Sequence, residues 1–315
     1  MRIFEHDEVR SFAEVRRKVG RRDMLIAGGT DLVPLMRDGL VTPRTVVDLK
    51  TVRNGAGIRA SRTGGALGAL ALVGDVAAHA AIRRWYAALA AACDAVGTPQ
   101  IRNMATIGGN LCQRIRCWYF RQNVPCHKTR GPVRSCPAVP GQNEYLAVFG
   151  DGPCHAPHPS DPAVALAALD AAILIRPGRS SGTTRRSIAE LYRDAATRRD
   201  GESILEPGDV IERIALPGSY AGARQVYLKA TQRAEWDFAL VSVAVVWPRG
   251  RGAVPRVVFG GVAPAPWPVP IAESGRGKRW AERVARAAVA GAKPMSHNAY
   301  KVELARNLLG EALRG

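Results

Sequence analysis

Cysteine is the residue whose placement in this chain points most clearly to chemistry. Five of the six cysteines in the 315-residue sequence lie between Cys112 and Cys154. Eight, nine and seventeen residues separate Cys117, Cys126, Cys136 and Cys154. Structural zinc sites usually pair ligands about two to four residues apart, whereas four cysteines on a Pro- and Gly-rich loop suit an iron–sulfur cluster. The spacing favours a cluster, and leaves a zinc site or free thiols open.

Neighbouring side chains bear on the same choice. No export signal is present, which disfavours a disulfide network. The stretch from Cys112 to Cys154 is basic, with Arg114, Arg116, Arg121, Lys128, Arg130 and Arg134 against Glu144 and Asp151. This excess of positive charge would offset the negative charge of a cluster and raise its potential. The histidines His127, His155 and His158 could also bind a metal, although a single loop histidine is usually only solvated.

Two segments with paired glycines form a second candidate site. AGGTDL (27–32) and TIGGNL (106–111) share one pattern, in which a glycine pair precedes a helix-compatible run. Paired glycines let the backbone approach a ligand and turn N–H groups toward an anion. The two segments could hold the two phosphates of one dinucleotide, or could be ordinary tight turns. Neither GxGxxG nor GxxxxGK[ST] occurs, so a Rossmann fingerprint and a P-loop are both absent.

Regular elements must position these segments. The first glycine pair ends a short buried strand (24–29) and precedes helical turns over 30–39. Hydrophobic periodicity predicts further strands at 45–49, 57–61, 65–72, 209–217, 223–231, 239–247 and 255–264. It predicts helices at 86–96, 277–291 and 298–314, and a helix leading into a strand over 160–176. The chain therefore reads as α+β with two main domains, divided near 176–187 or 206–209.

Composition excludes several classes of protein. No apolar run approaches the roughly 18 residues that cross a bilayer, and a charged N-terminus argues against an export signal, so we expect a cytoplasmic protein without a membrane span. Export in complex with a signal-bearing partner stays open. The net charge is +18, but the basic residues are scattered and aromatic residues make up only 6%. No nucleic-acid-binding signature accompanies this charge. We expect no nucleic acid partner, and favour an acidic protein partner instead.

Six motifs, in order along the chain, resemble one family. They are LIAGGTDLVPLM, QIRNMATIGGNL, HPSDPAVALAALDA, VYLKATQRAEWDFALVSVA, GGVAPAPWP and NAYKVELARNLL. They are similar to the FAD-binding medium subunit of the molybdenum hydroxylases, the xanthine dehydrogenase and carbon monoxide dehydrogenase family. The resemblance covers nearly the whole chain.

The resemblance implies a fold and a domain division. It implies a non-Rossmann FAD-binding domain of two α+β subdomains, at residues 1–55 and 56–215. A cysteine-rich loop at 112–157 belongs to the second subdomain. A smaller C-terminal α+β domain would occupy residues 216–315.

The cysteine stretch resembles one branch of this family, whose flavin subunit also carries a [4Fe–4S] cluster. That branch includes the flavin subunits of 4-hydroxybenzoyl-CoA reductase and of bacterial aldehyde oxidoreductases. The ligands there match Cys117, Cys126, Cys136 and Cys154. Cys112 is not among them, and Cys93, inside an expected helix, is most simply a small core residue.

The resemblance also implies which residues bind FAD. The pyrophosphate would be cradled by Ala27, Gly28, Gly29, Thr30, Asp31 and Leu32. The second wall of the cleft would be formed by Thr106, Gly108, Gly109 and Asn110. Asp161 matches an acidic residue that hydrogen-bonds the ribose or adenine end, Lys229 a lysine near the isoalloxazine ring, and Ile211 an apolar contact. Asp161 could equally be a helix N-cap, and Lys229 a solvated strand residue.

The function implied is that of an electron-transfer subunit of an oxidoreductase, with no catalytic residue for the substrate on this chain. A large partner subunit would carry the molybdenum cofactor, and a small one two [2Fe–2S] clusters. The chain would pass electrons to or from ferredoxin, NAD or another partner. Two other interpretations stay open: a stand-alone flavoprotein with a structural zinc loop, and a basic binding module without a cofactor. The substrate of the complex would be an aldehyde, aromatic or N-heterocyclic compound. The sequence identifies neither the individual substrate nor the direction of electron flow.

Overall fold

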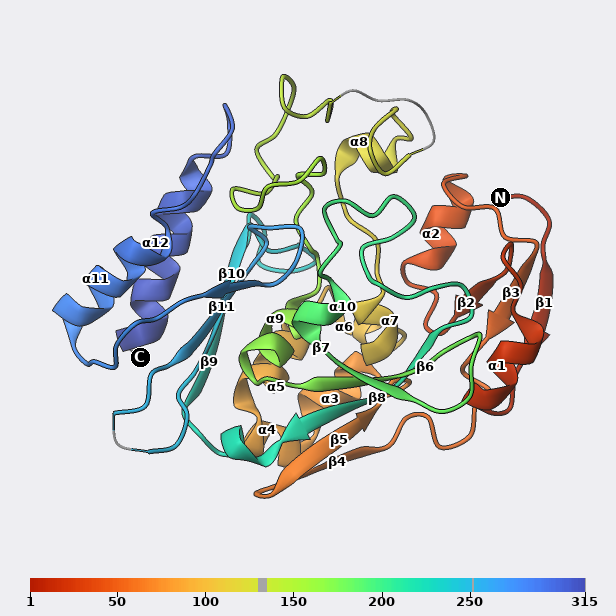
Figure 1. The fold of residues 1–315 in the computed structure, drawn as a ribbon, viewed down its shortest axis with the longest axis horizontal. Helices are drawn as coiled ribbons and strands as arrows, with labels where there is room; N and C mark the ends of the chain where they lie inside the picture. Colours follow the sequence, from red (N-terminus) through yellow and green to blue (C-terminus); the bar gives the residue numbers. More distant parts are fainter. Residues whose placement is uncertain (130–134, 251, 315) are drawn as a thin grey trace.

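The described residues form three β-sheets with helices packed around them. The computed structural model describes residues 1–129, 135–250 and 252–314. Figure 1 shows the N-terminal sheet at one end of the molecule and the C-terminal helices at the other. The α+β class expected from the sequence is therefore confirmed.

The first sheet is parallel, with strand order β1-β3-β2. Its elements are β1 (Glu5–Glu8), α1 (Phe12–Lys18), β2 (Met24–Ile26), α2 (Leu32–Arg37) and β3 (Thr45–Asp48). The sequence predicted β2, α2 and β3 but neither β1 nor α1. β1 reads EHDE and is largely exposed, so only its backbone pairing with β3 marks it as a strand.

The second sheet is antiparallel, and its strands come from both sides of the cysteine stretch. Its order is β4-β5-β8-β6-β7. The strands are β4 (Ile58–Ser61), β5 (Gly64–Gly68), β6 (Ala172–Arg176), β7 (Thr184–Ser187) and β8 (Val210–Pro217). The helices between them are α3 (Val73–Ala78), α4 (Ala80–Trp85), α5 (Ala87–Asp94), α6 (Pro99–Arg102), α7 (Ile107–Leu111), α9 (Asp161–Ala168) and α10 (Ile188–Leu191). The sheet and these helices share the largest buried core.

The third sheet is antiparallel and is covered on both faces. Its strands, in the order β12-β11-β10-β9, are β9 (Gln225–Ala230), β10 (Val241–Val246), β11 (Arg256–Gly260) and β12 (Trp267–Val269). A short 3₁₀ turn, η1 (Gly218–Tyr220), precedes it, and α11 (Lys278–Ala288) and α12 (Tyr300–Arg314) follow. Every residue of β10 is buried, because alternate side chains point to opposite faces. Val243 packs toward α11 and α12, whereas Ala244 belongs to the core of the second sheet.

The cysteine stretch between α7 and α9 is irregular, as expected. Within the described part of this stretch, α8 (Trp118–Arg121) is the only helix and no strand forms. In Figure 1 the stretch arches over one edge of the molecule, beyond α7 and α9.

The strands and helices predicted from Met24 to the C-terminus are confirmed, with ends shifted by a few residues. The predicted domain boundaries near 55 and 215 stay a prediction. The boundary near 55 lies between β3 and β4, whereas the boundary near 215 lies two residues before the end of β8 at Pro217. The core of the second sheet nevertheless includes Tyr227 and Ala244 of the third, so the second and third sheets are packed together.

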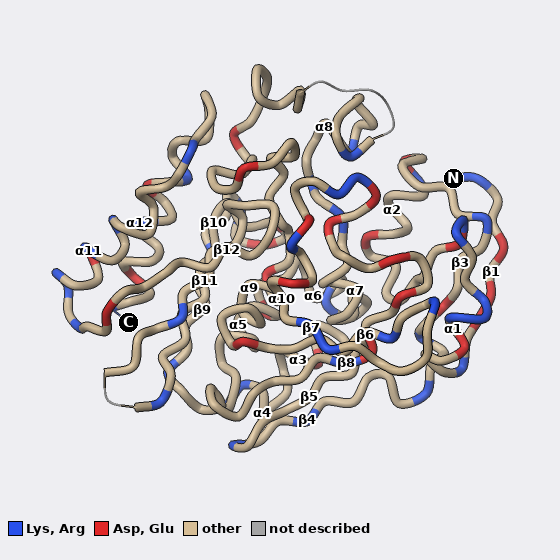
Figure 2. The backbone as a smooth tube through the Cα atoms, in the orientation of Figure 1, with Lys and Arg blue, Asp and Glu red and all other residues tan. Residues whose placement is uncertain are grey.

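Charged side chains are spread over the whole chain, with both signs interspersed (Figure 2). Among the described residues, no helix has the length and apolar character needed to cross a membrane.

A buried lysine ties the last helix to the end of the cysteine stretch. Lys301, in the first turn of α12, has no exposed surface. Its Nζ donates to the carbonyl oxygens of Tyr145 at 3.1 Å, Leu146 at 2.9 Å and Gly261 at 2.6 Å. Burial lowers the pKa of Lys301 to about 7. One ammonium group therefore satisfies three carbonyls. They belong to two chain segments that no strand pairing joins to each other.

We expect Lys301→Met to lower the free energy of unfolding by about 2–4 kcal/mol near pH 8.5, because buried carbonyls lose their donor. The ordinary pKa of lysine is 10.5 and the folded value is about 7. The folded chain therefore binds fewer protons than the unfolded chain between these values, and wild-type stability rises with pH across that window. Urea unfolding should show a larger loss near pH 8.5 than near about pH 6.

The control is Lys278→Met, since Lys278 is exposed on α11. Its effect should stay within about 0.5 kcal/mol at either pH. An equal loss of stability at both pH values in Lys301→Met would show that burial does not lower the pKa of Lys301 in the folded chain.

Candidate functional site

The first glycine segment leaves a row of backbone donors free. It connects β2 to α2, with Asp31 as N-cap. Within the described residues, no N–H group from Gly28 to Leu32 donates to another backbone group. Gly29 has a φ of 70°, which favours glycine because other residues are strained there. Successive free N–H groups in such a turn form a concavity that binds anions.

The second glycine segment is different, because its donors are already used. Residues 107–111 form α7, and the Thr106 side chain caps it by accepting from Gly109 N at 3.1 Å. The N–H groups of Ile107 and Gly108 donate to the carbonyls of Ala71 and Ala69. The free N–H groups expected here are therefore absent from this segment, since the Thr106 hydroxyl turns it into a capped helical turn.

Close packing brings the two segments together. A Cβ on Gly28 would lie 2.0 Å from the carbonyl oxygen of Met104, just before the second segment. A Cβ on Gly108 would lie 2.8 Å from the Ala69 Cβ. Glycine at both positions therefore lets backbones touch. The predicted walls of the cleft, Ala27–Leu32 and Thr106–Asn110, are neighbours in space, while their contacts with a cofactor stay a prediction.

Arginines of the cysteine stretch converge on Asp31. Its Oδ1 lies 2.9 Å from Arg116 and 2.8 Å from Arg121, and its Oδ2 accepts from the backbone N of Arg114 at 2.7 Å. The Asp31 carboxylate is thus occupied within the chain, which leaves the backbone of the segment for a ligand. Burial lowers the pKa of Arg116 to about 10, and Asp31 opposes that shift.

This arrangement changes the role expected for the basic residues near the cysteines. Arg114 lies 2.7 Å and Lys128 3.7 Å from the buried Glu202, so all four of these basic side chains that the structure describes face carboxylates. Arg130 and Arg134 lie outside the described residues. The cysteine loop is instead held by Lys128, whose buried Nζ donates to the carbonyls of residues 195, 198 and 201. Burial lowers the pKa of Lys128, and Glu202 opposes the shift.

A buried ion pair joins α9 to the third sheet. Ser160 is the N-cap of α9, and the next residue, Asp161, is 5% exposed. Asp161 accepts from the Lys229 Nζ at 2.8 Å and from the Tyr227 hydroxyl at 2.6 Å. Burial raises the pKa of Asp161, and Lys229 and Tyr227 oppose the rise. Lys229 is therefore buried and paired, not a solvated strand residue.

The ion pair brings Asp161 and Lys229 to one point of the site. Asp161 was expected at the ribose or adenine end of the cofactor and Lys229 near its ring. The two side chains lie 2.8 Å apart, and both expected contacts with the cofactor stay predictions. Ile211 is 3% exposed on β8 and belongs to the core of the second sheet, and its expected contact with the cofactor stays a prediction.

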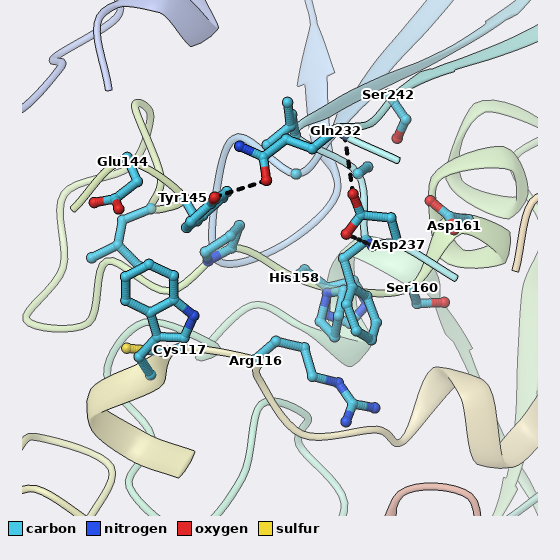
Figure 3. Close-up of a pocket in the computed structure, with 18 of the residues that line it drawn as sticks. Arg116, Cys117, Glu144, Tyr145, His158, Ser160, Asp161, Gln232, Asp237 and Ser242 are labelled. Carbon is cyan, nitrogen blue, oxygen red and sulfur yellow. Dashed lines mark hydrogen bonds between the residues drawn. The ribbon is translucent and has the colours of Figure 1, made fainter. Parts of the chain in front are cut away.

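A pocket of about 300 Å³ opens beside Asp161 (Figure 3). Its walls come from residues 116–119, 142–146, 157–164 and 232–242, together with Gly261. Several members are aromatic, and Arg116 stacks on Phe238 with 4.7 Å to the ring centroid. The Tyr145 hydroxyl and Gln232 close one side with a 2.8 Å hydrogen bond. Neither glycine segment lines this pocket, but Arg116 connects it to Asp31 of the first one.

A second, much smaller cavity of about 10 Å³ is lined by all four predicted ligands, Cys117, Cys126, Cys136 and Cys154. Burial raises the pKa of the Cys154 thiol to about 12. Within the described residues, no three His, Cys, Asp or Glu side chains form a group that could hold a single metal ion. The four cysteines thus line one cavity without forming a one-ion site within the described residues.

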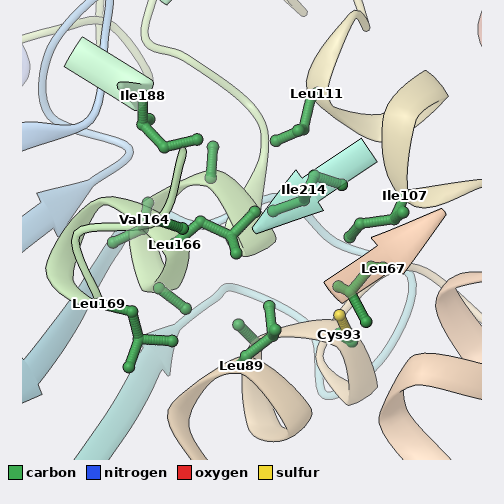
Figure 4. Packing of buried hydrophobic residues seen from close by; sticks show 14 of the residues in the cluster. Leu67, Leu89, Cys93, Ile107, Leu111, Val164, Leu166, Leu169, Ile188 and Ile214 are labelled. Atoms are coloured by element: carbon green, nitrogen blue, oxygen red, sulfur yellow. The ribbon is translucent and has the colours of Figure 1, made fainter. Parts of the chain in front are cut away.

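The other two cysteines lie elsewhere. Cys112 is exposed and lines neither cavity. Cys93 is fully buried in the core of the second sheet, near Leu67 and Leu89 (Figure 4). Its prediction as a core residue is confirmed.

Sequence reasoning missed three participants. Tyr227 could have been found, because it lies two residues before Lys229 on a strand and so faces the same side. The pairing of Arg116 with Asp31 has no local signal, because 85 positions separate the two residues. His158, treated above as a solvated loop histidine, is 4% exposed in the pocket wall.

We expect Lys229→Met to lower the free energy of unfolding by about 3–5 kcal/mol, because it leaves the Asp161 charge buried without its cation. The measurement is urea unfolding near neutral pH. Exposed Lys50 provides the control, and Lys50→Met should change stability by less than about 0.5 kcal/mol. The double variant Asp161→Asn/Lys229→Met should be more stable than Lys229→Met. Equal instability of the two would mean that lost packing, not the unpaired charge, causes the effect.

The sequence of this chain is similar to those of several known flavin-binding subunits. Residues 1–219 match the family described as FAD binding domain in molybdopterin dehydrogenase. The aldehyde oxidoreductase FAD-binding subunit PaoB of Escherichia coli (strain K12) is 38% identical over 324 aligned positions, covering 99% of this chain and 98% of the relative. The nicotinate dehydrogenase FAD-subunit of Eubacterium barkeri is 42% identical over 87 residues, or 28% of this chain and 29% of the relative.

Solved structures show the same fold. A chain of quinoline 2-oxidoreductase from Pseudomonas putida 86 has a TM-score of 0.73 at 20% identity, covering 99% of this chain and 96% of its own length. A chain of carbon monoxide dehydrogenase from Hydrogenophaga pseudoflava gives the same values. The fold expected from the resemblance is confirmed. The chain belongs to the family of FAD-binding medium subunits of the molybdenum hydroxylases, which are oxidoreductases.

Proposed function

We propose that this chain is the electron-transfer subunit of a molybdenum hydroxylase complex and holds both FAD and a [4Fe–4S] cluster. It passes electrons between the [2Fe–2S] clusters of a small partner subunit and an external partner such as ferredoxin or NAD. A large partner subunit with the molybdenum cofactor oxidises or reduces the substrate. Near full-length similarity to an aldehyde oxidoreductase subunit favours an aldehyde over an N-heterocycle.

The free N–H groups from Gly28 to Leu32 are the observation that supports FAD most directly. Diphosphates bind where several backbone donors converge, and Asp31 is turned away from them by Arg116 and Arg121. Thr106 and Asn110 would supply the facing wall, and the buried pair of Asp161 and Lys229 would lie farther along the cofactor. When bound, FAD supplies the exchange between one-electron and two-electron transfer, while this chain supplies position and electrostatics.

The cluster is supported by the convergence of Cys117, Cys126, Cys136 and Cys154 on one cavity. Four thiolates hold a [4Fe–4S] cluster, and each binds a different iron atom. Ligands of a cluster therefore stand farther apart than ligands of a single ion, which agrees with four cysteines that line one cavity without forming a one-ion site. Lys128 fixes the chain two residues after Cys126 to the loop at 195–201, which supports this geometry from outside.

The first experiment is an anaerobic absorption spectrum of the purified chain, with iron, acid-labile sulfide and FAD assayed on the same sample. We expect about four iron and four sulfide per FAD, as one [4Fe–4S] cluster requires. FAD with equimolar zinc and no iron would replace the cluster by a structural zinc loop. Folded protein that binds neither cofactor would contradict the whole proposal.

Cysteine variants test which residues hold the cluster. Cys136→Ser should remove most of the iron and sulfide, because serine does not replace a thiolate ligand. Cys112→Ser is the matched control and should keep the full iron content, since Cys112 lies outside the cavity. Loss of iron in Cys112→Ser but not in Cys136→Ser would refute the assigned ligand set.

A further inference from the structure

Two buried polar side chains in the wall of the larger pocket have no partner in the described chain. His158 is 4% exposed and neither of its ring nitrogens forms a hydrogen bond. The Ser242 Oγ is likewise buried and unpaired. Both residues line the pocket beside Asp161 (Figure 3). Buried polar groups are nearly always hydrogen-bonded, and an unpaired one costs about 1–3 kcal/mol. These atoms are therefore placed to hydrogen-bond a ligand in the pocket.

The remaining walls indicate what kind of ligand fits. They present flat surfaces, contributed by Trp118, Tyr119, Tyr145, Pro157, Pro159 and Phe238. The cations in the wall are already paired, Arg116 with Asp31 and Arg233 with Asp237. A phosphate would therefore meet no free positive charge here. A planar ring system with donors and acceptors on its edge matches both the flat walls and the unpaired polar atoms.

The position of the pocket connects it to the free N–H groups of the first glycine segment. Arg116 lies in the pocket wall and pairs with Asp31 at 2.9 Å. Ser160 also lines the pocket, and its hydroxyl lies 2.6 Å from the Oδ1 of Asn110 in the second segment. Arg116 therefore connects the pocket to the first glycine segment, and Ser160 connects it to the second. A ligand whose diphosphate binds at Gly28–Leu32 would lie next to the pocket.

We infer that this pocket receives the isoalloxazine ring of FAD and that His158 hydrogen-bonds the polar edge of the ring. The inference rests on the proposed function, and assigns both Asp161 and Lys229 to the ring end of the cofactor. His158 packs on the ring of Tyr192, with 4.2 Å between centroids, which fixes the imidazole plane. Burial lowers the pKa of His158 to about 3. The neutral imidazole of His158 offers one hydrogen-bond donor and one acceptor. It can therefore pair with the edge of the isoalloxazine ring, which also carries donors and acceptors.

The test measures binding of FAD and of ADP to the full-length chain freed of flavin. ADP carries the diphosphate but not the ring. His158→Phe keeps a flat ring of similar size without nitrogens, and should raise the Kd of FAD about tenfold, the loss of about one hydrogen bond. The Kd of ADP should not change. The visible absorption of the bound flavin should shift, and His158→Gln should restore most of the affinity.

The control is His79→Phe, the same change at a histidine outside the pocket, which should leave both affinities unchanged. Ala239→Phe provides a second variant that does not alter His158, since it fills the pocket from its wall. It should weaken FAD binding and leave ADP binding intact.

The outcomes separate this inference from the proposed function. Wild-type protein that binds no FAD contradicts the proposed function itself. Wild-type protein that binds FAD, together with an Ala239→Phe variant of unchanged FAD affinity, overturns the placement of the ring. A folded His158→Phe variant with unchanged FAD affinity and absorption, or one that loses ADP and FAD equally, overturns the role of His158.

Discussion

The buried pair of Asp161 and Lys229 is the interaction on which the candidate site depends. Lys229 also donates to the carbonyls of Ala95 and Asp237, so one ammonium joins the end of α5, the start of α9, β9 and the loop before β10. Removing two charges from water is costly unless hydrogen bonds compensate, and here four donor–acceptor contacts centre on the pair. A buried ion pair is weak evidence for stability but defines geometry. It fixes the second sheet to the third at the point where the pocket opens.

The same junction explains why a pocket exists there. β10 directs alternate residues into two cores, so the third sheet packs on the second sheet with one face and on α11 and α12 with the other. Side chains from separate packing units rarely fill their common border completely, and ligand pockets occur preferentially at such borders. At this border the filling is provided by loop residues at 116–119 and 142–146. Both loops belong to the cysteine stretch, whose described residues join no sheet and are held by side-chain contacts and single backbone hydrogen bonds.

These origins decide what the sequence could predict. The strands and helices depend on local hydrophobic periodicity, and the glycine segment at 27–32 depends on a single turn. The sequence could predict these features because each is encoded by neighbouring residues. The start of the helix predicted at residue 160 was equally local. The pairing of Asp31 with Arg116 and Arg121, the burial of His158 and the contact between Asp161 and Lys229 arise only when distant segments meet. The second glycine segment shows most clearly what local sequence cannot predict. Its sequence pattern is that of an anion-binding loop, but its N–H groups donate to Thr106 and to the carbonyls of Ala69 and Ala71.

The two cavities share a wall, which links the two proposed cofactors. Cys117, Tyr119 and Leu146 line both the cysteine cavity and the larger pocket. Metal binding contributes folding free energy to the loop that carries the ligands. A cluster held by Cys117 would therefore order the wall against which the flavin ring is proposed to lie. By linkage, any ordering that one cofactor supplies lowers the cost of binding the other by the same amount. An insertion of cysteines beside a flavin pocket would thus affect flavin affinity as well as electron transfer.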